Sequence, residues 1–394
     1  MHGEFEYSAD RHSAAVQPAR GLRIALFSGN YNYARDGANK ALNMLVGHLL
    51  DQGAAVRVYS PTVPQPAFAP TGDLVSVPSV PFPFRTEYRI ALGLPAPIRR
   101  DLAKFEPNVI HLSAPDWLGM AAQRHAKSLG LPIFASFHTR FETYFEYYGL
   151  GWLRDWAWQR QRRFYLDADR VLAPNAAVAA HLAHMGISPD KIRLWGRGVD
   201  TELFSPRRRD EQWRRAHGFT ASDIVMLFFG RTVREKGIDC FGETVRLLRA
   251  SGRTIRPLIV GDGPARRAME RDVPDATWTG HLDGPDLARA VASADILLNP
   301  SLTEAFGNVN LEAMAAGLAV VSADADSARS LIVDGREGLL RPADPAAMAE
   351  AVAMLIDQPE TRRRLAEAAV AAAARLQWPQ VLDAVIDAYR ELRA

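Results

Sequence analysis

The sequence has little cysteine, since Cys240 is the single one among 394 residues. One cysteine excludes a disulfide within the chain and a cysteine metal cluster, and it is typical of proteins of the reducing cytoplasm. No run reaches the ~18 uncharged apolar residues of a membrane-spanning helix, and residues 1–20 lack the apolar core of a signal peptide. We therefore expect a disordered tail over residues 1–20 and a globular, cytoplasmic protein after it.

The sequence also lacks the G-x-G-x-x-G pattern by which many α/β proteins bind dinucleotides. The nearest stretch, 28–40, has Gly37 ahead of a helix, which favours a phosphate only weakly. Asp-x-Asp pairs at 167–169 and 324–326 have the residue types for Mg²⁺. The first precedes a strand and the second lies in an alanine-rich turn, so we interpret both as structural and expect no metal and no cofactor.

What the chain does contain is an alternation of apolar runs and amphipathic helical stretches, which is typical of βαβ units around parallel sheets. The fold class is therefore α/β. In the first half the predicted strands are 23–28, 55–59, 109–112, 133–136 and 170–173. In the second half they are 224–229, 258–260, 296–299 and 319–322. The proline-rich stretch 61–97 predicts an ordered but irregular excursion.

The pattern restarts after residue 205, which predicts two similar doubly wound domains. We expect the first domain over 21–204 and the second over 205–375, with the polar, basic run 205–215 as linker. Ligands of such domains bind at the carboxyl ends of the strands. Residues 376–394 are predicted to form a terminal helix that packs back on the first domain through one apolar face: Val381, Leu382, Val385, Ile386 and Tyr389.

The strongest motif runs from Asn299 to Gly317 and reads NPSLTEAFGNVNLEAMAAG. A strand ends at Asn299, a loop carries Glu304, and a helix begins near Asn308 with Glu312 one turn inside it. Free amide groups at a helix start favour a diphosphate, and carboxylates accept hydrogen bonds from sugar hydroxyls. Two glutamates that merely stabilise a helix start are the alternative, which suits an isolated pair better than this full segment.

A second motif, FGRTVREKGID over residues 229–239, places Arg231 and Lys236 directly after a predicted strand. A nucleoside diphosphate gathers negative charge as it leaves a sugar, and fixed cations stabilise that charge. Solvated surface charge is the alternative, but the position beside Gly230 at a strand end favours a site. His138, which follows the strand 133–136, could hydrogen-bond a sugar, although a lone histidine is more often structural.

Together these segments resemble the family 4 glycosyltransferases of GT-B architecture, in which two Rossmann-like domains face a cleft. The resemblance covers roughly residues 22–341. The stretches LWGRGVDTELF at 194–204 and SFHT at 136–139 resemble the subgroup of sulfoquinovosyl-diacylglycerol synthases and GDP-mannose-dependent α-mannosyltransferases.

The resemblance implies a retaining, metal-independent transfer of a sugar from a nucleotide diphosphate bound by the second domain, with the acceptor on the side of the first. It implies catalytic roles for Glu304, His138, Arg231 and Lys236. By front-side attack, the leaving phosphate takes the acceptor proton, and Glu304 positions the sugar rather than attacking it. The implied donor-binding residues are Gly37, Gly230, Gly263, His281, Leu282, Phe306, Gly307, Asn308, Val309 and Glu312.

Two departures from the family pattern lie in this region. Gly37 follows an aspartate where the family usually has paired glycines, and Ala319 stands where it usually has proline. We expect the second to change local rigidity more than chemistry.

An aromatic and basic stretch over residues 144–165 gives an indication of the acceptor. Trp152, Trp156, Arg160 and Arg163 suit the interface of a bilayer, whereas a core-facing stripe with a solvated back fits the same pattern. With lipid-modifying proteins among those it resembles, we expect a lipid acceptor such as diacylglycerol, reached from the inner face of the cytoplasmic membrane. No nucleic acid partner is expected.

The sequence leaves alternatives open for the donor and for the activity. A UDP-sugar carrying a hexose or uronic acid is favoured. The alternative within the same architecture is a GDP-mannose-dependent α-mannosyltransferase acting on a glycan, polyol or glycolipid. From another class, a non-catalytic sugar-binding protein would share a cleft, but it would be expected to have an export signal and no pair of phosphate-binding cations.

Overall fold

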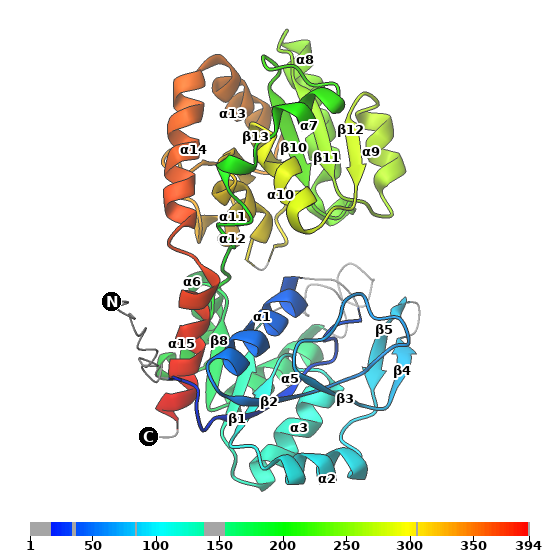
Figure 1. Ribbon diagram of the computed structural model, residues 1–394, viewed down its shortest axis with the longest axis vertical. Coiled ribbons are helices and arrows are strands. Elements are labelled where there is room, and N and C mark those ends of the chain that lie inside the picture. Colours follow the sequence, from blue (N-terminus) through cyan, green and yellow to red (C-terminus); the bar gives the residue numbers. More distant parts are fainter. Residues whose placement is uncertain (1–16, 34–36, 83–84, 138–153, 305, 393–394) are drawn as a thin grey trace, which may run out of the picture. The chain divides into compact units, whose positions relative to one another are not determined.

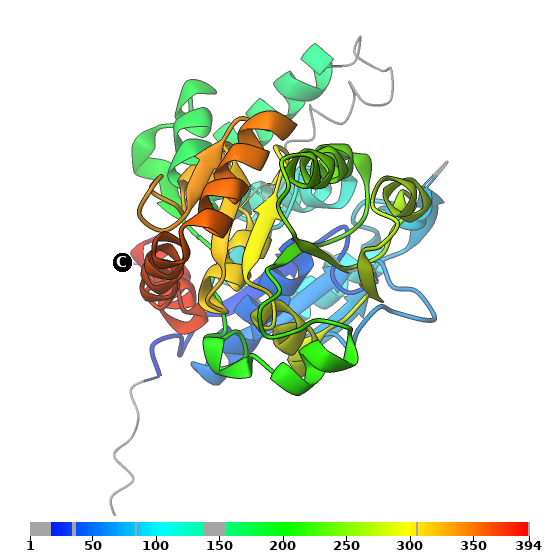
Figure 2. The same cartoon turned by 90° about the horizontal axis from the view of Figure 1, so that it is seen from above.

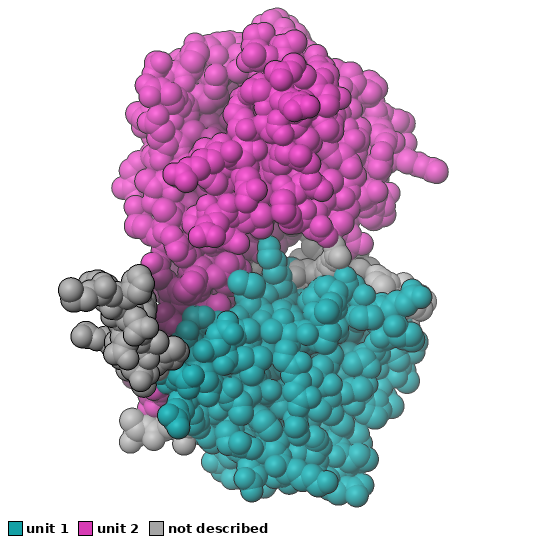
Figure 3. All heavy atoms as spheres, in the orientation of Figure 1, with its two compact units in different colours: residues 1–112, 116–133, 392–394 teal, residues 113–115, 134–391 magenta. Residues whose placement is uncertain are grey.

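The computed structural model describes residues 17–33, 37–82, 85–137, 154–304 and 306–392. Within them the chain forms two large parallel sheets and one small antiparallel hairpin, with helices between successive strands, which is an α/β fold (Figure 1). Contacts divide the chain into two compact units, which Figure 3 colours separately. Unit 1 holds 1–112, 116–133 and 392–394, and unit 2 holds 113–115 and 134–391.

The first sheet has the strand order β3-β2-β1-β6-β7-β8-β9, and its strands are shared between the two units. The strands are β1 (Arg23–Phe27), β2 (Ala55–Ser60), β3 (Asp73–Ser76), β6 (Val109–Leu112), β7 (Ile133–Ser136), β8 (Arg170–Ala173) and β9 (Ile192–Leu194). The helices between them are α1 (Gly37–Asp51), α2 (Ala96–Phe105), α3 (Trp117–Ser128), α5 (Arg154–Leu166) and α6 (Ala176–His184). The hairpin consists of β4 (Ser79–Phe82) and β5 (Arg85–Ala91).

The second sheet has the order β12-β11-β10-β13-β14-β15 and lies wholly in unit 2. All five neighbouring pairs are parallel. The strands are β10 (Val225–Phe229), β11 (Arg256–Val260), β12 (Thr277–Gly280), β13 (Ile296–Asn299), β14 (Ala319–Ala323) and β15 (Leu339–Arg341). The helices are α7 (Glu211–Ala216), α8 (Ile238–Ala250), α9 (Arg266–Asp272), α10 (Gly284–Ala292), α11 (Asn308–Ala315), α12 (Asp326–Arg329), α13 (Pro345–Asp357), α14 (Pro359–Ala373) and α15 (Trp378–Glu391).

Both faces of the second sheet are covered, which explains why its central strands read as unbroken apolar runs. On one face, Phe228 of β10 and Leu298 of β13 pack against α8 and α13. On the other face, Leu227 and Leu297 pack against α10 and α11. Figure 2 shows α8 and α13 together on one side of this sheet. The two buried layers hold the strands, and therefore the loops at their carboxyl ends, in fixed positions.

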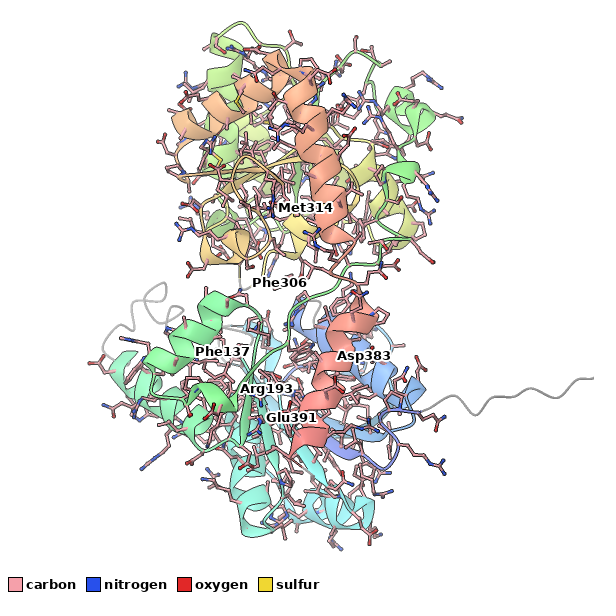
Figure 4. The ribbon with its side chains drawn as sticks, turned by 90° about the vertical axis from the view of Figure 1, so that its left-hand side faces the viewer. Phe137, Arg193, Phe306, Met314, Asp383 and Glu391 are labelled. Carbon is pink, nitrogen blue, oxygen red and sulfur yellow. The ribbon has the colours of Figure 1, made fainter. Side chains whose placement is uncertain are left out.

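The terminal helix α15 packs on the part of the first sheet that belongs to unit 2. Tyr389 meets Phe134 of β7 edge to face at 4.7 Å between ring centroids, and Glu391 accepts hydrogen bonds from Arg193 of β9. Figure 4 labels Arg193 and Glu391, which lie close together at the end of the helix. The prediction of a returning terminal helix is therefore confirmed.

Two sequence-based expectations were wrong. The stretch 61–97 was expected to be irregular, but it contains β3, which pairs with β2 in parallel register, and the hairpin of β4 and β5. The run 205–215 was expected to be a polar linker, but it contains most of α7. Arg214 of that helix is fully buried and donates to the carbonyls of Ser293, Thr220 and Asp223. The domain boundary near residue 205 stays a prediction.

A half-buried carboxyl group in unit 1 gives a testable pH dependence. Asp116 caps α3 by accepting from the amide of Gly119 at 2.7 Å, and its carboxyl also receives the amide of Gly29. Burial raises the pKa of the Asp116 carboxyl to about 6, although these amides act in the opposite direction. The folded state therefore binds this proton more tightly than the unfolded chain, whose carboxyl titrates near about 4.

The stabilising contribution of the protonated Asp116 is present below about pH 4 and is lost as the pH rises through about 6. We expect the free energy of unfolding to fall across this window. Asp116→Asn keeps the oxygen that accepts from Gly119 and cannot ionise, so its fall should be smaller. Urea denaturation at both ends of the window measures this, and an equal fall in the two proteins would contradict it.

Candidate functional site

The strand order of the second sheet creates a topological switch point between β10 and β13. From β10 the chain moves outward through β11 and β12, then returns to β13 on the opposite side and continues to β14 and β15. The connections that follow β10 and β13 consequently run towards opposite sides of the sheet. Ligands of open parallel sheets bind at the carboxyl edge between two such connections. Both sequence motifs lie in these two loops.

A contact between Lys236 and Glu304 joins the two loops. The ammonium of Lys236, at the end of the 3-10 helix η4 (Arg234–Lys236), donates to Oε1 of Glu304 in the loop after β13. The side chains are 27% and 17% exposed, so the pair is largely shielded yet still open to a ligand. A second bond, from Thr303 Oγ1 to the carbonyl of Glu235 at 3.3 Å, holds the same two loops together.

The loops after β10 and β11 approach backbone to backbone. A Cβ atom on Gly261 would lie 1.9 Å from the carbonyl oxygen of Gly230, and one on Gly263 would lie 2.4 Å from that of Thr232. The amide of Thr232 donates to the carbonyl of Asp262 at 3.1 Å. These glycines are required for packing between the loops, which is a structural reason for Gly263 that is independent of any ligand.

The start of α11 completes the edge. Gly307, with φ at 87°, is the residue before the helix, and within the described residues no side-chain hydrogen bond caps the helix start. The first amides of an α-helix have no partner within the helix and carry a partial positive charge. The segment 307–309 therefore presents amide donors beside the loop that carries Glu304, which suits a phosphate group.

The structure places most of the predicted donor-binding residues along this edge. Arg231 follows β10 and is exposed, and the structure gives its guanidinium no ion pair within the described residues. Val309 lies 3.9 Å from the position of a Cβ on Gly230. Glu312 is half-buried one turn into α11.

Other predicted residues are accounted for by the core or lie elsewhere. Phe306 is buried in the core beside α11, where Met314 also packs, and Figure 4 labels both. Leu282, after β12, packs against the same core, while its neighbour His281 is exposed. Gly37 is the first residue of α1 in unit 1.

Two of the predicted residues, His138 and Trp152, lie outside the described part of the chain. Their predicted roles beside the sugar and at a membrane therefore stay predictions.

Sequence reasoning missed a buried polar chain behind this edge. Asn299, at the end of β13, donates to Asn310 of α11 at 2.8 Å, and Asn310 donates to Ser322 of β14 at 3.0 Å. The signal that could have revealed it is the presence of polar residues inside otherwise apolar segments, since buried polar groups need partners.

Among the described residues, no group of three or more histidine, cysteine, aspartate or glutamate side chains is arranged to hold a metal ion. The second Asp-x-Asp pair forms ion pairs with Arg329. Within the same part of the chain, no helix has the length and apolar character needed to cross a membrane.

Two parallel sheets with helices packed on them match the GT-B class of glycosyltransferase architecture. Solved structures of this class superpose well on the chain. A sucrose-phosphate synthase from Thermosynechococcus elongatus covers 94% of this chain and 98% of its own length, with a TM-score of 0.77 and 21% identity. HepE of Anabaena in complex with UDP-glucose covers 93% and 99%, with a TM-score of 0.72 and 17% identity.

The chain belongs to glycosyltransferase family 4. The profile described as "Glycosyltransferase Family 4" matches residues 35–203, and the one described as "Glycosyl transferases group 1" matches residues 223–358. A "GDP-mannose-dependent alpha-mannosyltransferase" of Mycolicibacterium smegmatis is 34% identical over 95% of this chain and 100% of its own length. "Sulfoquinovosyl transferase SQD2" of Arabidopsis thaliana is 30% identical over 90% of this chain and 71% of its own length.

Proposed function

We propose that the protein is a retaining, metal-independent glycosyltransferase that binds a nucleoside diphosphate sugar at the carboxyl edge of the second sheet. The observation that carries the proposal is the meeting of Lys236 and Glu304 at the switch point, beside the uncapped start of α11. A cation, a carboxylate and free amides in one place match the phosphates and the sugar hydroxyls of such a donor.

In this proposal Lys236, Arg231 and the amides of α11 bind the diphosphate. An ammonium has three donors, so Lys236 can keep Glu304 as a partner while it also binds a phosphate oxygen. As the bond between the anomeric carbon and the diphosphate breaks, the added negative charge falls on oxygens next to fixed positive groups, which lowers the barrier. Glu312, one turn into α11, would accept hydrogen bonds from the ribose.

Retention is proposed to follow from attack on the face that the leaving group occupies. The acceptor hydroxyl forms the new bond to the anomeric carbon, its proton passes to the departing phosphate oxygen, and the bond to the diphosphate breaks. Glu304 holds the sugar and stabilises positive charge at the anomeric carbon, so no covalent glycosyl-enzyme forms. His138 would line the sugar from the first domain.

The donor proposed for first testing is GDP-mannose, because three of the relatives, at 30–34% identity, have the name "GDP-mannose-dependent alpha-mannosyltransferase". The UDP-sugar favoured by the sequence is the second candidate. Purified protein is incubated with GDP-mannose or with UDP-sugars against diacylglycerol, ceramide, polyols and oligosaccharides, and products are identified by mass spectrometry. Glycosylated product with one donor supports the proposal, whereas no product from any pair, with free nucleotide also absent, contradicts it.

A lipid acceptor is proposed from the exposed side of α5. Trp156 is 56% exposed and lies 5.3 Å from the guanidinium of Arg160, while Arg163 is exposed one turn further along. Phe164 and Tyr165 of the same helix are buried, so a core-facing stripe and an aromatic, basic surface coexist on it. Such a surface suits an anionic bilayer interface.

Flotation with vesicles containing anionic lipid tests this surface. We expect the protein to float with the vesicles at low salt, and the variant Trp156→Ala/Arg160→Gln to float markedly less. Arg207→Gln/Arg208→Gln, which removes two exposed cations from the short helix before α7, is the control and should behave like the wild type. Absence of wild-type binding at low salt would contradict the membrane proposal without affecting the donor site.

A further inference from the structure

A chain of buried side-chain hydrogen bonds behind the carboxyl edge of the second sheet links three elements of unit 2. Asn299 ends β13, Asn310 is the third residue of α11, and Ser322 lies in β14. The three residues are 8%, 1% and 1% exposed. Asn299 Nδ2 donates to Asn310 Oδ1 at 2.8 Å, Asn310 Nδ2 donates to Ser322 Oγ at 3.0 Å, and Ser322 Oγ donates to the carbonyl of Ala323 at 3.3 Å.

The backbone at both ends fixes the direction of this chain. At one end, the amide of Ser301 can only donate, and it does so to Asn299 Oδ1 at 3.2 Å. At the other end, the carbonyl of Ala323 can only accept. Each amide side chain between them must therefore point its oxygen towards Ser301 and its nitrogen towards Ala323, so no residue can flip without leaving a buried group unsatisfied.

This chain of hydrogen bonds reaches the proposed donor site at two points. Ser301 begins the loop that carries Glu304, and its amide is held by Asn299. Asn310 belongs to the first turn of α11, whose leading amides face the proposed diphosphate. Asn310 therefore joins the start of α11 to β13 and β14, and it fixes the amide of Asn299, which in turn holds the carboxylate loop through Ser301.

We propose that Asn310 is a positioning residue, which holds the start of α11 and the Glu304 loop in the orientation that binds the diphosphate sugar. This inference rests on the proposed function, because it assigns a role at that same site. A buried apolar side chain would fill the space at no desolvation cost. What the amide adds is a directional link between helix and strands, and catalysis that depends on fixed dipoles requires such a link.

The test compares Asn310→Leu with Asn310→Asp and with a control. Leucine has a similar size but removes the acceptor of Asn299 Nδ2 and the donor to Ser322 Oγ, which keeps only its bond to the carbonyl of Ala323. Aspartate keeps the oxygen that accepts from Asn299, and the Ser322 hydroxyl can turn to donate to it. Thr244→Val is the control, because it removes the partly buried hydrogen bonds from Thr244 Oγ1 of α8 to the carbonyls of Cys240 and Pro345, in the opposite core layer.

The readouts are the melting temperature, the Kd for GDP and for UDP by calorimetry, and the separate KM values for donor and acceptor. We expect Asn310→Leu to weaken nucleoside diphosphate binding by on the order of tenfold, with the acceptor KM unchanged. Asn310→Asp should recover most of the loss. Thr244→Val should lower the melting temperature similarly and leave the Kd at the wild-type value.

Wild-type Kd in a folded Asn310→Leu variant would overturn the inference, as would an equal loss in Thr244→Val. If Asn310→Leu does not fold, Ser322→Ala, which removes only the far partner, carries the test with an expected loss of about threefold and the same contradicting result. Failure of the wild-type protein to bind either nucleoside diphosphate would refute the proposed function itself, and that outcome is read before any variant is compared.

Discussion

Replacement of Lys236 with methionine is expected to lower kcat by about 10²- to 10³-fold with the preferred donor, the loss typical of removing one preorganised group that stabilises developing negative charge. Methionine has nearly the length of the lysine stem, so packing between the loops after β10 and β13 is kept while the cation is removed. The side chain is only 27% exposed, so water does not easily replace its charge. Steady-state kinetics with saturating acceptor measures the effect.

The matched control is Arg234→Met in the same 3-10 helix, because Arg234 is exposed and two residues away. It changes net charge by the same amount, so a general electrostatic effect would appear in both variants. We expect kcat of Arg234→Met within about twofold of the wild type, as for surface changes away from a site. Equal losses in the two variants, or a loss below about threefold for Lys236→Met, would contradict the role of Lys236.

The Glu304→Gln variant is expected to lose about 10²-fold in kcat, with the donor KM much less affected. Glutamine keeps the shape of the side chain and an oxygen that can accept from Lys236, so the loops stay joined. What it lacks is the negative charge that stabilises the positive charge at the anomeric carbon. Glu235→Gln, which changes an exposed neighbouring carboxylate, is the control and should retain wild-type kcat.

Near-normal turnover by Glu304→Gln would refute the role of this carboxylate. The same experiment distinguishes positioning from covalent catalysis. Mass spectrometry of wild-type protein quenched during turnover is expected to show no glycosyl adduct, because Glu304 is proposed to hold the sugar and not to attack it. A protein mass increased by one hexosyl group would contradict that part of the account.

Much of the fold was predictable because parallel sheets covered on both faces need continuous apolar strands. The bounds predicted for the strands 109–112, 133–136 and 170–173 agree with β6, β7 and β8. The helix expected to begin near Asn308 agrees with α11, which begins at that residue. Each of these elements has a strong local pattern that the surrounding structure reinforces.

Elements with weak local patterns were not predictable. The strand β3 is short and only partly buried, and it forms by pairing with β2, so its own residues carry little signal. Pro81 lies within β4, which a proline disfavours except in an edge or hairpin strand. The basic run before α7 looks solvated, and nothing local distinguishes the buried Arg214 from its exposed neighbours.

From the residues alone the candidate site was predictable as two separate motifs, and only the family resemblance assigned Lys236 and Glu304 to one donor site. Lys236 and Glu304 are 68 residues apart, and their contact depends on β10 and β13 being neighbours in the sheet. The order of strands in a sheet cannot be predicted from any single segment of the sequence. The same limit applies to Asn310, whose partners lie on two different strands.

Calorimetric titration of the purified protein with GDP and with UDP, in buffer containing EDTA, tests the central claim most directly. The account predicts saturable 1:1 binding of at least one of them without any metal, and at least a tenfold weaker Kd in Lys236→Met than in Arg234→Met. No heat with either nucleoside diphosphate, or equal binding by the two variants, would contradict it.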